Sequence, residues 1–173
     1  MPVPHHHLQE LDSSCMAACL RMVLSRAGVA RGEHEVREAL GPPPLTLECA
    51  EAFGDHYPLD PDNPANLDFL LQVVDRGWCL VEVRGGPAAH NAGLGGLNSP
   101  HGALALPRHG LPLEMTATPH HIIVLTAQES GALTYLDPWY SSSGQPLRVN
   151  RTDFIASWWT GALLVPSDLA SKM

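Results

Sequence analysis

Near the start of the chain, apolar residues recur every three to four positions, which is the spacing of one buried helix face. That face comprises Cys15, Ala18, Cys19, Met22 and Val23. Short polar residues precede it and Gly28 follows it, as is typical of the two ends of a helix. The pattern predicts a helix over residues 13–26 whose first turn holds Cys15. Further helices are predicted at residues 33–40, at about 46–53 and at 67–76, with Asn63 or Asn66 capping the last.

After residue 77 the pattern changes to short apolar runs that are typical of strands. Strands are predicted at residues 78–83, 121–127, 132–136 and 161–165, with a turn at 128–131 and a short helix within 149–157. Residues 54–65, 85–110 and 137–146 lack a clear period and are predicted to be loops. Because helices come first and strands second, we expect an α+β fold with a C-terminal antiparallel sheet, in a single domain over residues 1–173.

The charge balance narrows the class of partner. The 173 residues carry a formal net charge of −8, which argues against nucleic acid as a partner. Runs of 18 apolar residues, which a membrane-spanning helix requires, are absent from the sequence, and so is the pattern of a secretory signal at residues 1–14. We therefore expect a cytoplasmic protein without a membrane span.

The four cysteines, Cys15, Cys19, Cys49 and Cys79, include no CxxC pair. That spacing favours neither a disulfide framework nor a structural zinc site. Cys15 differs from the others because the free N–H groups and the dipole at a helix start favour a nucleophilic thiolate. The alternative for Cys15 is a small buried residue, and this alternative is the one we expect for the other three.

The remaining metal candidates are histidines. His5, His6 and His7 form a run near the N-terminus, and five more histidines are spread between residues 34 and 109. Their spacing matches neither a zinc finger nor a zinc-protease helix, so we expect no metal and no other cofactor. The run itself is predicted to be disordered and incidental.

A nucleophilic cysteine needs a base, and the predicted hairpin offers one. A turn centred on Glu129 places His121 opposite Asp137, and a four-residue turn places His121 opposite Pro138. In either register Asp137 lies beside His121 and could orient its ring. His120 is the other candidate base. Both faces of the strand are apolar, so alternation does not choose between the histidines, whereas the register favours His121.

Gln9 precedes Cys15 by six residues. A side-chain amide delivered by the segment that leads into the nucleophile's helix can donate to an oxyanion. The sequence thus offers a nucleophile, a base, an orienting carboxylate and an oxyanion donor.

Several motifs resemble one family. The run from Gln9 to Cys15, followed by small residues and a Met-x-Leu helix, resembles the opening of the bacteriocin-processing double-glycine leader peptidases, family 39 of the papain-like cysteine peptidases. The run His121-Ile-Ile-Val-Leu followed by Leu136-Asp137-Pro138, and the closing Phe154…Trp-Thr-Gly161 run, resemble the later motifs of that family. The resemblance implies a papain-like α+β fold in which the nucleophile's helix packs on the sheet.

The resemblance also implies a role for each residue. Cys15 would be the nucleophile, His121 the general base and acid, Asp137 the orienting residue, and Gln9 part of the oxyanion hole. Two departures matter. Met16 stands where the family usually has glycine, and the transmembrane and ATP-binding parts that accompany well-known members are absent from this sequence.

These residues predict a thiol peptidase that hydrolyses a peptide bond in a peptide or protein substrate, with leader-peptide processing as the reaction that the resemblance implies. One alternative is an acyltransferase or transglutaminase-like enzyme with the same triad. Another is a papain-like module that binds peptides without cleaving them, a reading to which Met16 lends weight. The glycine-rich residues 85–110 are predicted to shape the substrate site, and of Trp139, Trp158 and Trp159 one or two are expected in the core and the rest in a peptide groove.

Overall fold

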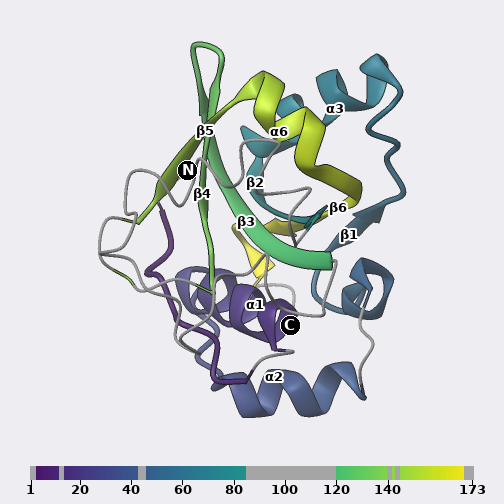
Figure 1. Ribbon diagram of the computed structural model, residues 1–173. Helices are drawn as coiled ribbons and strands as arrows, with labels where there is room; N and C mark the ends of the chain where they lie inside the picture. Colours follow the sequence, from purple (N-terminus) through teal and green to yellow (C-terminus); the bar gives the residue numbers. More distant parts are fainter. Residues whose placement is uncertain are drawn as a thin grey trace.

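The computed structural model describes residues 3–11, 14–42, 46–84, 120–139, 142 and 145–169, and for residues 84, 120, 153, 156 and 157 the backbone alone. The elements follow the chain in the order α1 (Cys15–Arg26), α2 (Glu33–Leu40), the 3₁₀ helix η1 (Leu47–Ala50), β1 (Asp55–Tyr57), α3 (Pro64–Val74), β2 (Gly77–Arg84), β3 (His120–Glu129), β4 (Ala132–Leu136), β5 (Leu147–Asn150), α6 (Arg151–Ser157) and β6 (Trp158–Pro166). The fold is therefore α+β, with a helical N-terminal part (Figure 1).

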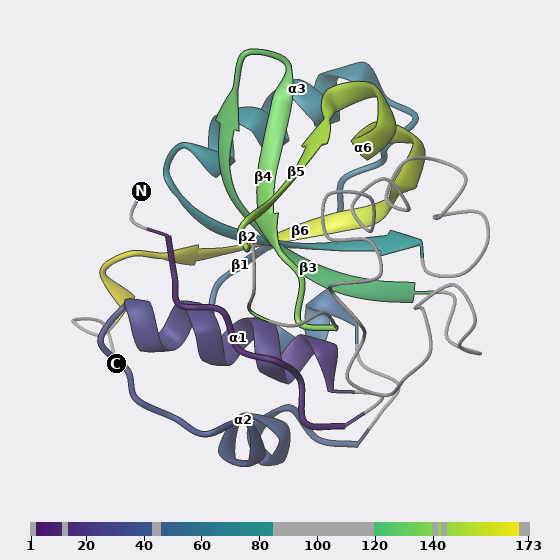
Figure 2. The same cartoon turned by 60° about the vertical axis from the view of Figure 1, so that its left-hand side comes forward.

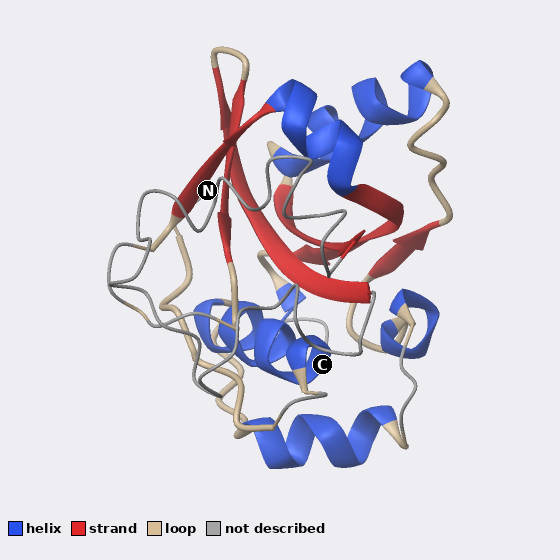
Figure 3. Ribbon diagram, viewed as in Figure 1, coloured by secondary structure: helices blue, strands red, loops and turns tan. Residues whose placement is uncertain are grey.

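The six strands form one sheet in the order β1-β6-β2-β3-β4-β5, and each neighbouring pair is antiparallel. The helices cover both faces. The helices α1 and α2 lie on one side of the sheet, and α3 and α6 lie on the other (Figures 1 and 3). The central strands β2, β3 and β6 are thus buried on both faces, which explains their nearly continuous apolar runs.

Side-chain alternation along β2 separates the two cores. Trp78 and Leu80 pack in the cluster that contains the buried residues of α1, whereas Cys79 and Val81 pack in the cluster that contains those of α3. Met16, the residue after Cys15, belongs to the first cluster and is 1% exposed. The Met16 side chain therefore lies in the hydrophobic core between α1 and the sheet.

The predicted helix at 13–26 is observed as α1, which begins at Cys15 itself. Ser14 precedes it, but its hydroxyl makes no capping hydrogen bond and instead accepts from Leu11 N at 2.9 Å. Gly28 follows the helix with φ +89°, a conformation that glycine adopts without strain. The predicted helix at 33–40 is confirmed as α2 with the same bounds.

Two predictions in the middle of the chain are wrong in part. The predicted helix at 46–53 is only the short 3₁₀ helix η1. The predicted loop at 54–65 contains the edge strand β1 and the start of α3, whose cap is Asn63, with its side chain accepting from Ala65 N at 3.0 Å. At Gly54 the chain passes very close to Leu164. A Cβ added at Gly54 would lie only 2.3 Å from the backbone carbonyl oxygen of Leu164. The absence of a side chain there allows β1 to pair with β6.

The C-terminal half also differs from the prediction in detail. The strand β3 extends to Glu129, so the turn holds two residues, 130 and 131, rather than four. The predicted helix within 149–157 begins only at Arg151, because the preceding residues form β5. The predicted loop at 85–110 lies outside the described residues. Among the helices that are described, none has the length and apolarity to cross a membrane.

Candidate active site

The start of α1 positions Cys15. This end of the helix lies beneath the first residues of β3 (Figure 2). Cys15 is partly exposed and packs against the hydrophobic cluster between α1 and the sheet. As the first residue of the helix, it has a backbone N–H that no intrahelical carbonyl can accept, and it experiences the positive end of the helix dipole.

His121 and Asp137 form a buried pair. The distance between His121 Nε2 and Asp137 Oδ1 is 2.7 Å, and each residue is 3% exposed. The predicted proximity is therefore confirmed.

The register that suggested this proximity is wrong. The two-residue turn and a bulge near Thr126 together pair Val124 with Leu136, and extending this pairing would place Trp139 opposite His121. The strand β4 ends at Leu136 instead, and the following turn brings the Asp137 carboxylate back to His121.

Cys15 is the other side chain that interacts with the His121 ring. Asp137 bonds to Nε2, so Nδ1 is the ring nitrogen available to Cys15. Burial lowers the pKa of His121, but the charge and hydrogen bond of Asp137, together with the hydrogen bond and charge of Cys15, outweigh burial and raise that pKa to about 10. A pKa raised in this way favours the charged imidazolium form of His121 at neutral pH. His121 is the histidine that bonds to Asp137, and for residue 120 the backbone alone is described.

Asp137 makes hydrogen bonds to Trp139 and Gln145 as well as to His121. Its Oδ1 also accepts from Trp139 N at 2.9 Å. Gln145 bonds to its backbone twice, with Asp137 N donating to Gln145 Oε1 and Gln145 Nε2 donating to Asp137 O, both at 2.8 Å. The carboxylate is thus fixed by local backbone bonds as well as by the imidazole.

The histidine run is ordered, contrary to the prediction. His6 Nε2 lies 2.7 Å from Asp137 O, and its Nδ1 lies 2.7 Å from Ser142 Oγ. Burial lowers the pKa of His6, and its interactions with Asp137 offset this only in part. A neutral His6 fits these contacts because one ring nitrogen can donate while the other accepts. No local pattern indicates a contact between residues 136 positions apart, such as that of His6 with Ser142.

Gln9 is fully buried and joins the N-terminal segment to the turn after β4. Its backbone N–H donates to Pro138 O at 2.8 Å, beside Asp137. Its side-chain Nε2 donates to Leu11 O at 2.7 Å, and an amide nitrogen carries two hydrogens. Gln9 therefore lies beside the turn that carries Asp137, on the segment that leads into Cys15.

Glu33 is a buried carboxylate that the sequence analysis missed. Its two oxygens each lie 3.1 Å from Glu10 N, which donates to them. His7 Nε2 lies 3.5 Å from one carboxylate oxygen and Arg37 Nε 3.8 Å from the other. Burial raises the pKa of Glu33, although these hydrogen bonds and Arg37 act in the opposite direction. Glu33 thereby links α2 to the segment between Gln9 and Cys15.

The other three cysteines lie elsewhere. Cys19 is buried with its Sγ 3.4 Å from Ile122 O, and desolvation raises its pKa well above the usual value. Burial also raises the pKa of Cys79, to about 12. Cys49 is exposed on η1, so the prediction that it is a core residue is wrong. Its Sγ lies 3.6 Å from Thr46 Oγ1.

Of the three tryptophans considered above for a peptide groove, Trp139 and Trp158 are buried in the core, whereas Trp159 is 41% exposed. Within the described ranges no group of three His, Cys, Asp or Glu side chains is arranged to hold a metal ion.

Comparison with known proteins adds no assignment. No protein-family model matches this chain, and no curated protein matches it. The candidate site consequently rests on the geometry of Cys15, His121, Asp137 and Gln9.

Proposed function

We propose that the protein is a cysteine peptidase with a papain-like arrangement, in which a helix start presents the nucleophile to a histidine on the sheet. One observation carries this proposal: His121 is bonded through Nε2 to Asp137 at 2.7 Å and has Cys15 as its second partner. A nucleophile, a base and an orienting carboxylate in contact are the recurring arrangement of acyl-transfer enzymes on unrelated folds.

In the first half of the reaction the Cys15 thiolate attacks the carbonyl carbon of a peptide bond. A C–S bond forms, and the carbonyl oxygen becomes an oxyanion. The His121 imidazolium then gives its proton to the leaving nitrogen, and the C–N bond breaks to leave a thioester on Cys15. Because the pKa of His121 is raised to about 10, the ring carries this proton at neutral pH.

The oxyanion requires donors on the side of the carbonyl away from the imidazole. The backbone N–H of Cys15 supplies one, because the first N–H groups of a helix lack intrahelical acceptors. The Gln9 side chain would supply the other through Nε2. Its bond to Leu11 O and its backbone bond to Pro138 O restrict the position of that amide.

In the second half, neutral His121 takes a proton from water, which attacks the thioester and releases the acid. The proton taken from water makes His121 an imidazolium again. The C–S bond of the thioester breaks, and Cys15 leaves as a thiolate. If an amine replaced water in this step, the same site would catalyse acyl transfer. The burial of Met16 supports an active enzyme over a non-cleaving peptide binder, because the extra bulk at this position lies in the core.

The proposal predicts cleavage that depends on Cys15 and His121. A peptide library prepared from a proteome, incubated with the parent protein, should yield new termini that mass spectrometry can map. Cys15→Ala should abolish them, and His121→Ala should reduce their rate of formation by about 10² to 10⁴. Cys49→Ala is the matched control and should cleave as the parent does.

Cleavage that survives Cys15→Ala would refute the assignment. A parallel digestion with an added primary amine separates hydrolysis from acyl transfer, because transfer adds the mass of the amine to the new C-terminus. We expect hydrolysis products to dominate.

A further inference from the structure

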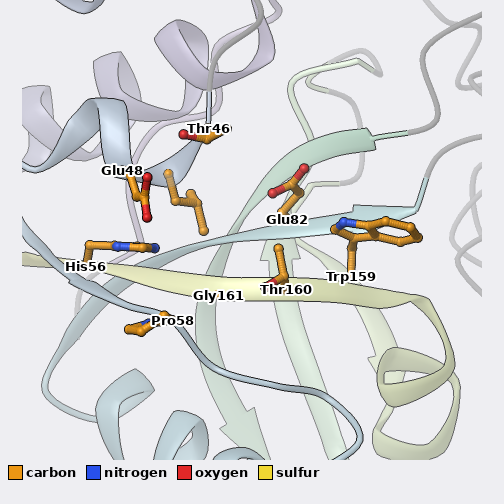
Figure 4. Close-up of a pocket in the computed structure, with 9 residues that line it drawn as sticks. Thr46, Glu48, His56, Pro58, Glu82, Trp159, Thr160 and Gly161 are labelled. Carbon is orange, nitrogen blue, oxygen red and sulfur yellow. The ribbon is translucent and has the colours of Figure 1, made fainter.

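The pocket between the 3₁₀ helix η1 and the strands β1, β2 and β6 is separate from the candidate active site (Figure 4). Glu82 and Trp159, which line this pocket, already interact with other groups of the protein. Glu82 pairs with Ile122 across the sheet, and alternation directs the side chain of the next residue, His121, to the opposite face. The contacts that bear on the candidate site lie instead around Asp137, where the N-terminal segment meets the turn after β4.

Asp137 lies just beyond the sheet. The strand β4 ends at Leu136, so pairing with a neighbouring strand does not fix the backbone of residue 137. Its N–H donates to the side chain of Gln145 instead. Asp137 is 3% exposed, which leaves little room for water around its carboxylate. The orientation of this carboxylate therefore depends on the side chains that bond to the backbone of Asp137, as well as on the groups that bond to the carboxylate itself.

The N-terminal segment bonds to two successive carbonyl groups of this turn. His6 Nε2 lies 2.7 Å from Asp137 O, and Gln9 N donates to Pro138 O at 2.8 Å. Six residues after Gln9, the same segment reaches Cys15. The segment thus connects the turn that carries the orienting carboxylate to the nucleophile, and His6 is its contact with Asp137.

The two ring nitrogens of His6 have different roles. A carbonyl oxygen can only accept, so a neutral His6 carries its hydrogen on Nε2 and leaves Nδ1 to accept from the Ser142 hydroxyl at 2.7 Å. Burial lowers the pKa of His6 and so favours this neutral ring. Gln145 Nε2 also donates to Asp137 O at 2.8 Å and lies 2.8 Å from His6 Nε2. Two donors from different segments therefore converge on one carbonyl oxygen.

We propose that His6 is a positioning residue of the candidate site, whose Nε2–H holds the peptide unit of Asp137 so that the carboxylate meets His121. The bond favours the arrangement in which Asp137 Oδ1 lies 2.7 Å from His121 Nε2. His6 acts on the reaction through Asp137, because that is the residue of the triad that it contacts. Its effect on catalysis rests on the proposed function, whereas its effect on His121 can be measured without substrate.

The test compares two substitutions that differ in which ring nitrogen they imitate. The amide nitrogen of glutamine reaches about as far from the backbone as Nε2, so His6→Gln keeps a donor for Asp137 O. The asparagine amide reaches only about as far as Nδ1, so His6→Asn loses this donor while the side chain stays polar. His5→Asn makes the same change at the exposed neighbouring position and is the matched control.

An NMR titration of the His121 ring gives the first readout. In His6→Asn we expect the midpoint to lie at least about half a pH unit below that of the parent, because a less well placed carboxylate stabilises the imidazolium less. On a peptide identified by the digestion above, kcat should fall about tenfold while KM changes less than about twofold. His6→Gln should recover most of both effects, and His5→Asn should behave as the parent does.

The tautomer of His6 in the parent protein provides a test that requires no folded variant. Long-range proton–nitrogen NMR correlations distinguish a ring protonated at Nε2 from a ring protonated at Nδ1. We expect the hydrogen on Nε2. A hydrogen on Nδ1 alone would leave His6 unable to donate to Asp137 O and would overturn the proposal.

The variants can also overturn it. If the His121 midpoint in His6→Asn equals that of the parent, or if His6→Gln does not reverse the shift, His6 contributes only to packing. The two proposals fail separately. Cleavage by a parent whose His121 midpoint and kcat do not respond to His6→Asn would refute the positioning role alone. A midpoint that shifts in His6→Asn and returns in His6→Gln, in a protein that cleaves nothing, would refute the peptidase alone.

Discussion

At the scale of single residues, what distinguishes Cys15 is its surroundings. Cys19 and Cys79 are buried among apolar groups that raise the pKa of each thiol, so both are expected to be inert. Cys15 contacts an imidazole whose pKa is about 10, raised by Asp137 and by Cys15 itself against the opposing effect of burial. In the proposed mechanism the reactive group is the pair of side chains, Cys15 and His121, and Asp137 maintains the charge on His121.

Removing the charge of Asp137 should lower the pKa of His121. In the parent protein, an NMR titration of the His121 ring should show a midpoint near 10, and in Asp137→Asn the midpoint should move to lower pH. The imidazolium would then be lost earlier as the pH rises, and the alkaline limb of the activity profile should move in the same direction.

Asp60→Asn, at an exposed and distant position, is the control and should leave the titration unchanged. An ordinary midpoint of about 6.5 in the parent, or the same midpoint in Asp137→Asn, would contradict the assigned role.

At the scale of elements, the segment before α1 carries much of the site. His6 contacts the backbone of Asp137, Gln9 bonds to Pro138, and Glu10 bonds to Glu33 on α2. This segment thus joins the turn after β4 to the helix α2, and it delivers both Gln9 and Cys15. Because Glu33 is buried and accepts from Glu10 N, its removal should loosen the segment between Gln9 and Cys15.

Glu33→Ala should lower the free energy of unfolding by about 1–3 kcal/mol, because the Glu10 N–H loses a buried acceptor. It should also lower kcat more than it changes KM, since the oxyanion donor acts in the transition state. Urea denaturation and peptide hydrolysis measure the two effects. Glu33→Gln, which keeps one acceptor oxygen, should recover part of both.

The control is Glu35→Ala, an exposed residue on the same helix, whose effect on stability should stay within about 0.5 kcal/mol. If Glu33→Ala behaves as Glu35→Ala does, Glu33 has no positioning role.

At the scale of the whole molecule, local patterns predicted the elements well where an element is long or sharply bounded. The helix α2 and the strand β4 have the predicted bounds, because glycines or turn residues flank them in the sequence. The strands β1 and β5 hold three and four residues, too few alternations for a pattern to stand out. The sequence also gave no sign of the bulge near Thr126, which depends on pairing with β4.

Only part of the candidate site could be predicted from the sequence. Cys15 and the pairing of His121 with Asp137 follow from a helix start and a hairpin, which are local features. The roles of His6 and Glu33 depend on contacts between distant segments, which one sequence does not display. Cys49 was expected in the core because most free cysteines are buried, but the short 3₁₀ helix that carries it leaves it at the surface.

The central claim is that the fold activates Cys15 among the four cysteines, and alkylation tests it most directly. Two are accessible: Cys15 in part and Cys49 fully. With limiting iodoacetamide at about pH 6, where an ordinary thiol is almost entirely protonated, we expect Cys15 to be labelled well before the more exposed Cys49. Peptide mapping by mass spectrometry gives both rates in one sample. In His121→Gln the order should reverse. Faster labelling of Cys49 in the parent, or an unchanged rate at Cys15 in His121→Gln, would contradict the account.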